Sequence, residues 1–331
     1  MKARIALLYG GASSEHDVSV MGYEYMKELL KGSDYELLPV YVDKSGEWFI
    51  RLKGADIPAF PTRKMGGSLY TGYGFIKIDA AIPLLHGEGG EDGSVQGALE
   101  VASIPYVGAD VCTSAVCLDK AYTKAIADAL GIPTLPGISF HVPTDTEKAL
   151  AMCRKRIDFP MFIKPRRLGS SVGAYPAKDE DGFRRVFPLS MRDGANLVTV
   201  EKMLTCKREL ECAFYEAKGE RIITPPGEIL IDGFYGYGEK YSGKTDTQTI
   251  ADVCESVKQR IREDCEKLAD ALVLRHLARI DFFLTDEGVF FNEINTFPGF
   301  TCESLYPKML KAHGIDPAKA IISFIEDALA C

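Results

Sequence analysis

The chain has 331 residues, and 46% of them are hydrophobic. This length exceeds what one ordinary core holds, so it predicts a compact, soluble protein of two or three packed units. The 39 lysines and arginines against 47 aspartates and glutamates give a net charge of -8. This balance opposes attraction to a phosphate backbone and argues against a nucleic-acid partner.

The N-terminal segment MKARIALLYGG has an apolar run that extends only over residues 5–9 and ends in two glycines. It predicts a first β-strand rather than a secretion signal. No run approaches the roughly 18 apolar residues that a membrane span requires. The nine cysteines are scattered without CxxC pairs or histidines at zinc spacing, which predicts reduced, structural thiols. Together these features predict a cytoplasmic protein with no membrane partner.

Strand-like and helix-like stretches alternate over the first hundred residues. The strands are predicted at 5–9, 37–42 and 80–85, and the helices at 20–30 and 94–102. Such alternation is typical of a parallel sheet flanked by helices, and therefore of an α/β fold.

The remainder of the chain mixes helices with further strands, which favours α+β character in parts. Helices are predicted at 119–130 and 256–273, and strands at 161–163, 197–200, 210–215, 278–284 and 288–294. Between them lies a turn-rich stretch at 232–249. A structureless stretch of that length inside a compact domain is more often a lid than a connector.

Two glycine-rich turns follow predicted strands. The first is GGASSEH at 10–16, and the second is HGEGGEDG at 86–93, which carries His86 and Glu91. The carboxyl ends of strands in an open α/β sheet form the edge that binds ligands. The alternatives are that the second turn is purely geometric and that Ser13 or Ser14 merely caps the next helix.

A phosphate grip is predicted at KPRRLGSSVG, where Lys164 and the amides of small residues can surround polyphosphate oxygens. Lys120 is a second candidate cation. Neither a GxGxxG fingerprint nor a Walker A lysine is present, so another nucleotide-binding mode is required. The alternative for each lysine is a solvated surface charge.

A metal site is predicted on two strands near the C-terminus. Arg279 and Asp281 share one face of the first strand, as Glu293 and Asn295 do on the second. Two carboxylates and an amide oxygen suit magnesium that stays bridged to nucleotide phosphates. The alternative is a structural ion pair between Arg279 and one carboxylate.

Short segments along essentially the whole chain carry a resemblance. In order they are GGASSEHDVS, HGEGGEDGSVQGALE with IPYVG, DKAYTK, KPRRLGSSVG, RELE, FYGYGEKY, ARIDFF, and NEINTFPGFT followed by SLYP. In this order they resemble the D-alanine–D-alanine ligase family of the ATP-grasp superfamily. The resemblance implies a Rossmann-like N-terminal substrate domain at 1–116, a central ATP-grasp subdomain at 117–206, and a C-terminal subdomain at 207–331 with a mobile loop at 232–249.

The resemblance also implies the reaction. ATP phosphorylates the carboxylate of one D-alanine, and the amine of a second D-alanine attacks the acylphosphate, which yields a dipeptide for peptidoglycan precursors. The implied cofactors are ATP and two magnesium ions, with manganese as a substitute, and the implied assembly is a homodimer.

Matched motif by motif, the resemblance places Glu15 at the ammonium of the first D-alanine, with His86 and Glu91 in the same pocket. Ser170 and Tyr241 would form a hydrogen-bonded triad with Glu15.

The same match implies that Arg279 and the Gly299 amide stabilise the tetrahedral oxyanion, and that Ser304 and Leu305 meet the carboxylate of the second substrate. The implied nucleotide-binding residues are Lys120, Lys164, Ser171, Glu201, Lys202, Leu204, Glu209, Phe234 and Lys240, and the implied metal ligands are Asp281, Glu293 and Asn295.

Two other functions stay open. One is a ligase of the same mechanism that takes D-serine as acceptor, although Tyr241 and Leu305 favour the D-alanine type. The other is a noncatalytic nucleotide-binding relative, which is expected to lose metal carboxylates that this chain keeps.

Overall fold

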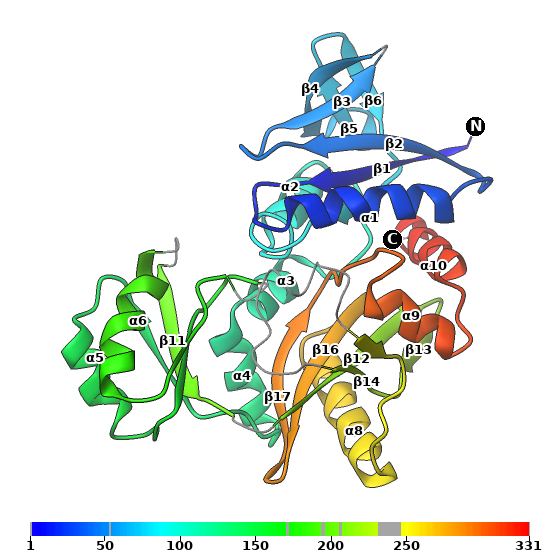
Figure 1. Ribbon diagram of the computed structural model, residues 1–331. Coiled ribbons are helices and arrows are strands. Elements are labelled where there is room, and N and C mark those ends of the chain that lie inside the picture. The colour runs from blue at the N-terminus through cyan, green and yellow to red at the C-terminus, as the bar shows by residue number, and fades with distance from the viewer. Residues whose placement is uncertain are drawn as a thin grey trace.

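The computed structural model describes residues 2–52, 54–169, 172–192, 196–204, 207–230 and 246–330. Three β-sheets organise these residues, and the two ends of the chain lie on the same side of the molecule (Figure 1). Over the described ranges, no helix is long and apolar enough to cross a membrane.

The first sheet has seven strands in the order β6-β5-β4-β3-β2-β1-β7. Its members are β1 (Ala3–Gly10), β2 (Tyr35–Val42), β3 (Trp48–Leu52), β4 (Ala55–Thr62), β5 (Ser68–Thr71), β6 (Gly74–Lys77) and β7 (Ala80–Leu84), with a 3-10 turn η1 (Lys64–Gly66) after β4. Helix α1 (His16–Leu29) packs on one face of β7 and α2 (Ser94–Val101) packs on the other. All five residues of β7 are therefore buried.

The predicted parallel sheet is correct for β2, β1 and β7 and wrong for the rest of this sheet. Strands β3 to β6 pair antiparallel with their neighbours. Antiparallel neighbours need only short turns, whereas parallel ones need a crossover helix. Strands β3, β5 and β6 have only four or five residues, and β4 contains Pro58 and Pro61, so the sequence shows no long apolar run there.

The second sheet forms a smaller unit beside the rest of the molecule, at the left of Figure 1. Its strand order is β10-β9-β11-β8. The strands are β8 (Gly137–His141), β9 (Met161–Pro165), β10 (Tyr175–Ala177) and β11 (Leu197–Lys202), and the helices α5 (Thr146–Cys153) and α6 (Glu180–Arg192) share their hydrophobic core.

The third sheet is antiparallel and follows the order β15-β14-β12-β16-β17, with β13 paired to β12. Its strands are β12 (Arg208–Ala217), β13 (Glu220–Ile223), β14 (Gly227–Leu230), β15 (Asp246–Gln248), β16 (His276–Thr285) and β17 (Gly288–Asn295). The remaining helices are α3 (Val111–Leu118), α4 (Lys120–Ala129), α8 (Glu255–Ala271), α9 (Leu305–Ala312) and α10 (Pro317–Ala330). Strand β15 occupies part of the stretch that the sequence predicts to be structureless.

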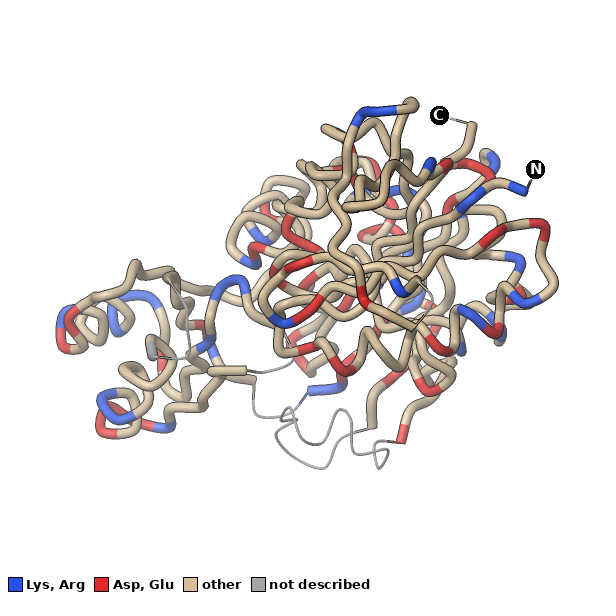
Figure 2. The backbone as a smooth tube through the Cα atoms, turned by 90° about the horizontal axis from the view of Figure 1, so that it is seen from above, with Lys and Arg blue, Asp and Glu red and all other residues tan. Residues whose placement is uncertain are grey.

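Packing links parts of the chain that are distant in sequence. Helix α4 packs against β17 of the third sheet, although it precedes the whole second sheet. Helices α9 and α10 lie in one core with β1 and β7 of the first sheet. Basic and acidic stretches are interspersed over both the main body and the smaller unit (Figure 2). The domain division at 116/117 and 206/207 stays a prediction.

Candidate active site

The two glycine-rich turns meet at one edge of the first sheet. Strands β1 and β7 run parallel, with Tyr9 opposite Leu84, so the turns that follow them leave the sheet side by side. The Ser13 hydroxyl joins them by donating to the carbonyl oxygen of His86 at 2.7 Å. The N-cap of α1 is Glu15, so the capping alternative is wrong for Ser13.

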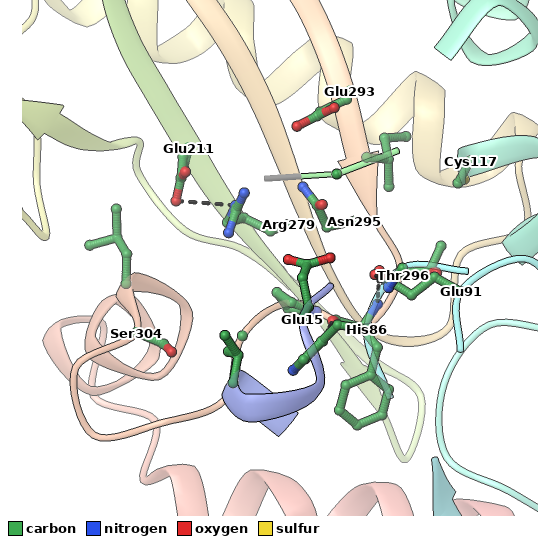
Figure 3. A pocket seen from close by; sticks show the side chains of 18 of the residues that line it. Glu15, His86, Glu91, Cys117, Glu211, Arg279, Glu293, Asn295, Thr296 and Ser304 are labelled. Atoms are coloured by element: carbon green, nitrogen blue, oxygen red, sulfur yellow. Dashed lines mark hydrogen bonds and ion pairs between the residues drawn. The ribbon is translucent and has the colours of Figure 1, made fainter. Parts of the chain in front are cut away.

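A pocket opens at this edge and extends to the third sheet (Figure 3). Ten residues singled out from the sequence line it, from segments that are far apart in the chain. They are Glu15, His86, Glu91, Lys120, Arg279, Glu293, Asn295, Gly299, Ser304 and Leu305.

Two glycines leave the space that Glu15 fills. A Cβ atom on Gly87 would lie 3.1 Å from Oε2 of Glu15, and one on Gly169 would lie 3.0 Å from the same oxygen. Real Cβ atoms rarely come that close to an oxygen, so each glycine permits the approach. The carboxylate therefore sits between the His86 turn and the predicted phosphate loop.

His86 and Glu91 contact the backbone of Phe297, which follows β17. Nδ1 of His86 lies 3.0 Å from the carbonyl oxygen of Phe297, and a carboxylate oxygen of Glu91 accepts from the Phe297 amide at 3.0 Å. A carbonyl oxygen only accepts, so Nδ1 carries the proton. Burial lowers the pKa of His86, so Nε2 of the neutral ring is an acceptor that lines the pocket. Nε2 has no hydrogen-bond partner among the described residues.

Burial, followed by the charge of Glu15, raises the pKa of Glu91 from 4.5 to about 7. The folded protein thus favours the protonated form. This preference stabilises the fold fully below pH 4.5 and is lost as the pH rises through about 7.

Glu91→Gln removes the charge that burial opposes. We therefore expect the free energy of unfolding of the variant, relative to wild type, to rise by up to about 3 kcal/mol between about pH 5 and pH 7.5. Urea titrations across this range measure it. Glu88→Gln, at an exposed position of the same turn, should give a flat difference; a flat difference for Glu91→Gln too would contradict the assignment.

A β-bulge between β16 and β17 changes which side chains of β17 point toward the pocket. Asp281 pairs with Glu293 and Phe282 pairs with Phe291, with an irregularity between them. Phe291 and Ile294 both enter the core, which regular alternation forbids for residues three apart. The bulge therefore lets Glu293 face the pocket. The predicted shared face of the two strands is confirmed.

Three carboxylates form a row across the third sheet. Glu211 on β12 is opposite Asp281 on β16, which is opposite Glu293 on β17. Arg279 donates two hydrogen bonds of 2.8 Å to Asp281 and lies 3.1 Å from Glu211. Asn295 also donates to Asp281, at 3.1 Å.

These contacts include the ion pair of the alternative interpretation. These contacts leave lone pairs on the carboxylates that can coordinate a metal ion, because one carboxylate offers about four lone-pair sites. Like charges directly opposite each other on a sheet are destabilising, and a hard divalent cation would offset them. No three His, Cys, Asp or Glu side chains in the described ranges form a metal site by themselves. The residues thus fit a cation that also takes oxygens from the Asn295 amide and a ligand.

The predicted phosphate cations lie in buried ion pairs. Lys120 contacts Glu293 at 3.0 Å, and its pKa is raised because that pairing outweighs burial. Lys164 on β9 contacts Glu201 on β11 at 2.9 Å. The surface-charge alternative is therefore wrong for both lysines, which are 9% exposed.

The other predicted nucleotide residues within the described ranges lie on β11, on β12 or in the connection between these strands, and they are not in the pocket lining. Lys202 pairs with Glu287 at the surface at 3.0 Å, Glu209 pairs with Lys207, and Leu204 lies in the connection between the second and third sheets. Ser170, Ser171, Phe234, Lys240 and Tyr241, together with most of the predicted loop, lie outside the described residues.

Two buried residues of this region were not predicted individually. Lys124 donates to Glu201 at 2.6 Å, and Glu211 pairs with Arg279. Signals for both exist in the sequence: Lys124 is four residues after Lys120 and therefore on the same helix face, and Glu211 alternates with Glu209 in the strand RELE.

Helix α4 links the second and third sheets, since Lys124 pairs with Glu201 on β11 and Lys120 pairs with Glu293 on β17. Two sheets linked in this way and joined to an α/β unit define a protein of the ATP-grasp fold. The D-ala D-ala ligase C-terminus family matches residues 126–326 and the D-ala D-ala ligase N-terminus family matches residues 4–109. The chain belongs to the D-alanine–D-alanine ligase family.

Relatives match over nearly the whole chain. A D-alanine--D-alanine ligase of Sodalis glossinidius is 36% identical, with 95% of this chain and 92% of the relative covered. The solved D-alanyl-alanine synthetase A of Vibrio cholerae has a TM-score of 0.89 and 34% identity, with 100% and 99% covered. The VanG D-Ala:D-Ser ligase of Enterococcus faecalis has a TM-score of 0.88 and 29% identity, with 99% and 100% covered.

Proposed function

We propose that this family member joins two D-alanine molecules at the expense of ATP and so supplies D-alanyl-D-alanine for peptidoglycan precursors. The observation that carries the proposal is the convergence in one pocket of acceptors for an ammonium group, a partly buried arginine, and a helix N-terminus that suits a carboxylate. Each comes from a different part of the chain.

The first D-alanine would bind at Glu15 and His86. The carboxylate of Glu15 balances the ammonium charge, and Nε2 of His86 is a buried acceptor without a partner among the described residues. An ammonium hydrogen bond would satisfy that nitrogen. Glu91 supports this pocket indirectly, since its carboxyl oxygens accept from the backbone amides of Gly87 and Phe297.

The second D-alanine would bind with its carboxylate at the start of α9. Ser304 is the N-cap of this helix, and Ser304, Leu305 and Lys308 line the pocket. Amides at a helix N-terminus favour an anion. The acceptor's amine would then face the activated carboxyl group, where Arg279 and the Gly299 amide would stabilise the oxyanion.

ATP supplies the phosphoryl group that activates the first carboxylate, and a divalent cation neutralises charge on the phosphates. We propose magnesium, with manganese as a substitute, held by Asp281, Glu293 and Asn295. Lys120 and Lys164 would turn from their carboxylate partners to the phosphates, joined by Ser171 and Lys240.

The nucleoside would bind along the connection from β11 to β12. Its contacts would come from Glu201, Lys202, Leu204, Glu209 and Phe234.

Closure of the 232–249 loop would bring Tyr241 to Ser170 and Glu15 and exclude water from the acylphosphate. The need for ATP favours a cytoplasmic location, and the family resemblance favours a homodimer.

Gly87→Ala tests the placement of Glu15. The new Cβ would displace Oε2, and we expect the KM for D-alanine to rise about tenfold, which corresponds to about 1.4 kcal/mol. Gly89→Ala is the matched control, because Gly89 has φ +83° against +68° for Gly87 but nothing within 4 Å of its Cβ position. Both variants should lose similar stability, and an equal rise in KM would show that backbone strain alone is responsible.

The function is tested by phosphate release from ATP and magnesium with D-alanine, L-alanine, or D-alanine mixed with D-serine, with products identified by mass. D-alanyl-D-alanine from D-alanine alone is the expected product. Preferential formation of D-alanyl-D-serine would assign the other acceptor, and no turnover with any amino acid would support a noncatalytic binding protein.

A further inference from the structure

Lys124 on α4 shares one buried carboxylate with a proposed phosphate-binding lysine. Its Nζ donates to Oε1 of Glu201 at 2.6 Å, while Nζ of Lys164 lies 2.9 Å from Oε2. The side chains of Lys124, Glu201 and Lys164 are 8%, 4% and 11% exposed. One carboxylate from β11 is thus held from two sides by ammonium groups of α4 and β9.

The charge balance of this cluster leaves room for an anion. Lys120 and Glu293 lie next to it, so three buried lysines face one buried carboxylate, Glu201, and one partly buried carboxylate, Glu293. Buried like charges are costly unless opposite charge offsets them. Phosphate oxygens would supply that charge.

Binding of phosphates would, however, draw Lys164 away from Glu201. Loss of the partner of a buried carboxylate strongly lowers the stability of the folded protein. The two lysines hold the pKa of Glu201 at about 2, although burial alone would raise it. Of the two lysines that form ion pairs with Glu201 in the described part of the chain, Lys124 is the one outside the proposed phosphate-binding set.

We propose that Lys124 is a positioning residue for the nucleotide: it holds Glu201 ionised and in place while Lys164 turns to the phosphates. The inference rests on the proposed function, since it presumes that the site binds ATP. Lys124 itself touches neither substrate.

A positioning role and a purely structural salt bridge predict different effects of substituting Lys124. A structural bridge would contribute to the stability of the nucleotide-free protein only. A positioning residue acts on nucleotide affinity through Glu201, so the effects of Lys124 and Glu201 substitutions must be non-additive.

The test is calorimetric titration of the full chain with a non-hydrolysable ATP analogue and magnesium, without amino acid. Lys124→Met should weaken binding about tenfold or more, since it removes one partner of a buried charge pair. Lys124→Met added to Glu201→Gln should cause no further loss, and Lys124→Arg should recover most of the affinity. In turnover, the KM for ATP should rise while the KM for D-alanine stays unchanged.

Lys31→Met, which removes an exposed ion pair with Glu28 on α1, should leave nucleotide affinity unchanged. Wild-type affinity in Lys124→Met, or additive losses in the double variant, would overturn this inference and leave the proposed function standing. No binding by the wild type would overturn both. If Lys124→Met alone does not fold, the comparison of Glu201→Gln with the double variant decides the question.

Discussion

Glu293→Gln is expected to lower kcat for ligation about a thousandfold, because a bound cation contributes several kcal/mol and each ~1.4 kcal/mol is tenfold in rate. Glutamine keeps the size of the side chain but removes the charge of one proposed ligand. It also releases Lys120, which Glu293 holds at 3.0 Å. Loss of the ion pair with the buried Lys120 should also lower the free energy of unfolding, so kcat is measured at a temperature where the variant stays folded.

Two readouts separate loss of a metal ligand from general damage. Manganese binding in the presence of an ATP analogue, followed by electron paramagnetic resonance, should weaken in Glu293→Gln. Asp286→Asn, at an exposed position in the turn of the same hairpin, should match wild type. Ligation by Glu293→Gln at a near-parental rate would show that this carboxylate does not hold the cation.

The strand pair that carries Glu293 shows what the sequence could predict. Alternation along ARIDFF and NEIN placed Arg279 with Asp281 and Glu293 with Asn295, and the register of β16 and β17 confirms both faces. The prediction succeeded because side-chain direction in a strand is local. The bulge behind it was not predicted, since it depends on how β17 meets its partner.

Long-range packing was the part that sequence patterns did not reveal. The antiparallel strands β3 to β6 were missed, as was the packing of α4 on β17. Lys124 and Glu211 went unnoticed because each looks like an ordinary charge until another element buries it. Glu91 differs, because the loop that carries it was predicted. Only the structure shows that Glu91 accepts from the backbone amide of Phe297, between β17 and α9.

Arg279→Met is expected to affect both activity and stability. The guanidinium lies between Asp281 and Glu211, which raise its pKa well above the usual value against the effect of burial. Its loss leaves two buried carboxylates without this partner, which costs about 3–5 kcal/mol for a buried pair. Loss of oxyanion stabilisation should lower kcat by a further factor of about 10² to 10³.

Separating these two effects requires a control variant that loses stability but keeps the proposed oxyanion stabilisation. Arg260→Met removes the nearer of two basic partners of Asp264, a buried carboxylate on α8. It is expected to lower the free energy of unfolding without lowering kcat at a temperature where the protein stays folded. Arg279→Lys keeps a positive charge but cannot bind both carboxylates through a planar fork. It should therefore be more stable than Arg279→Met, yet still slow. If Arg279→Lys or Arg279→Met, measured while folded, ligated at the wild-type rate, Arg279 would have only the structural ion-pair role.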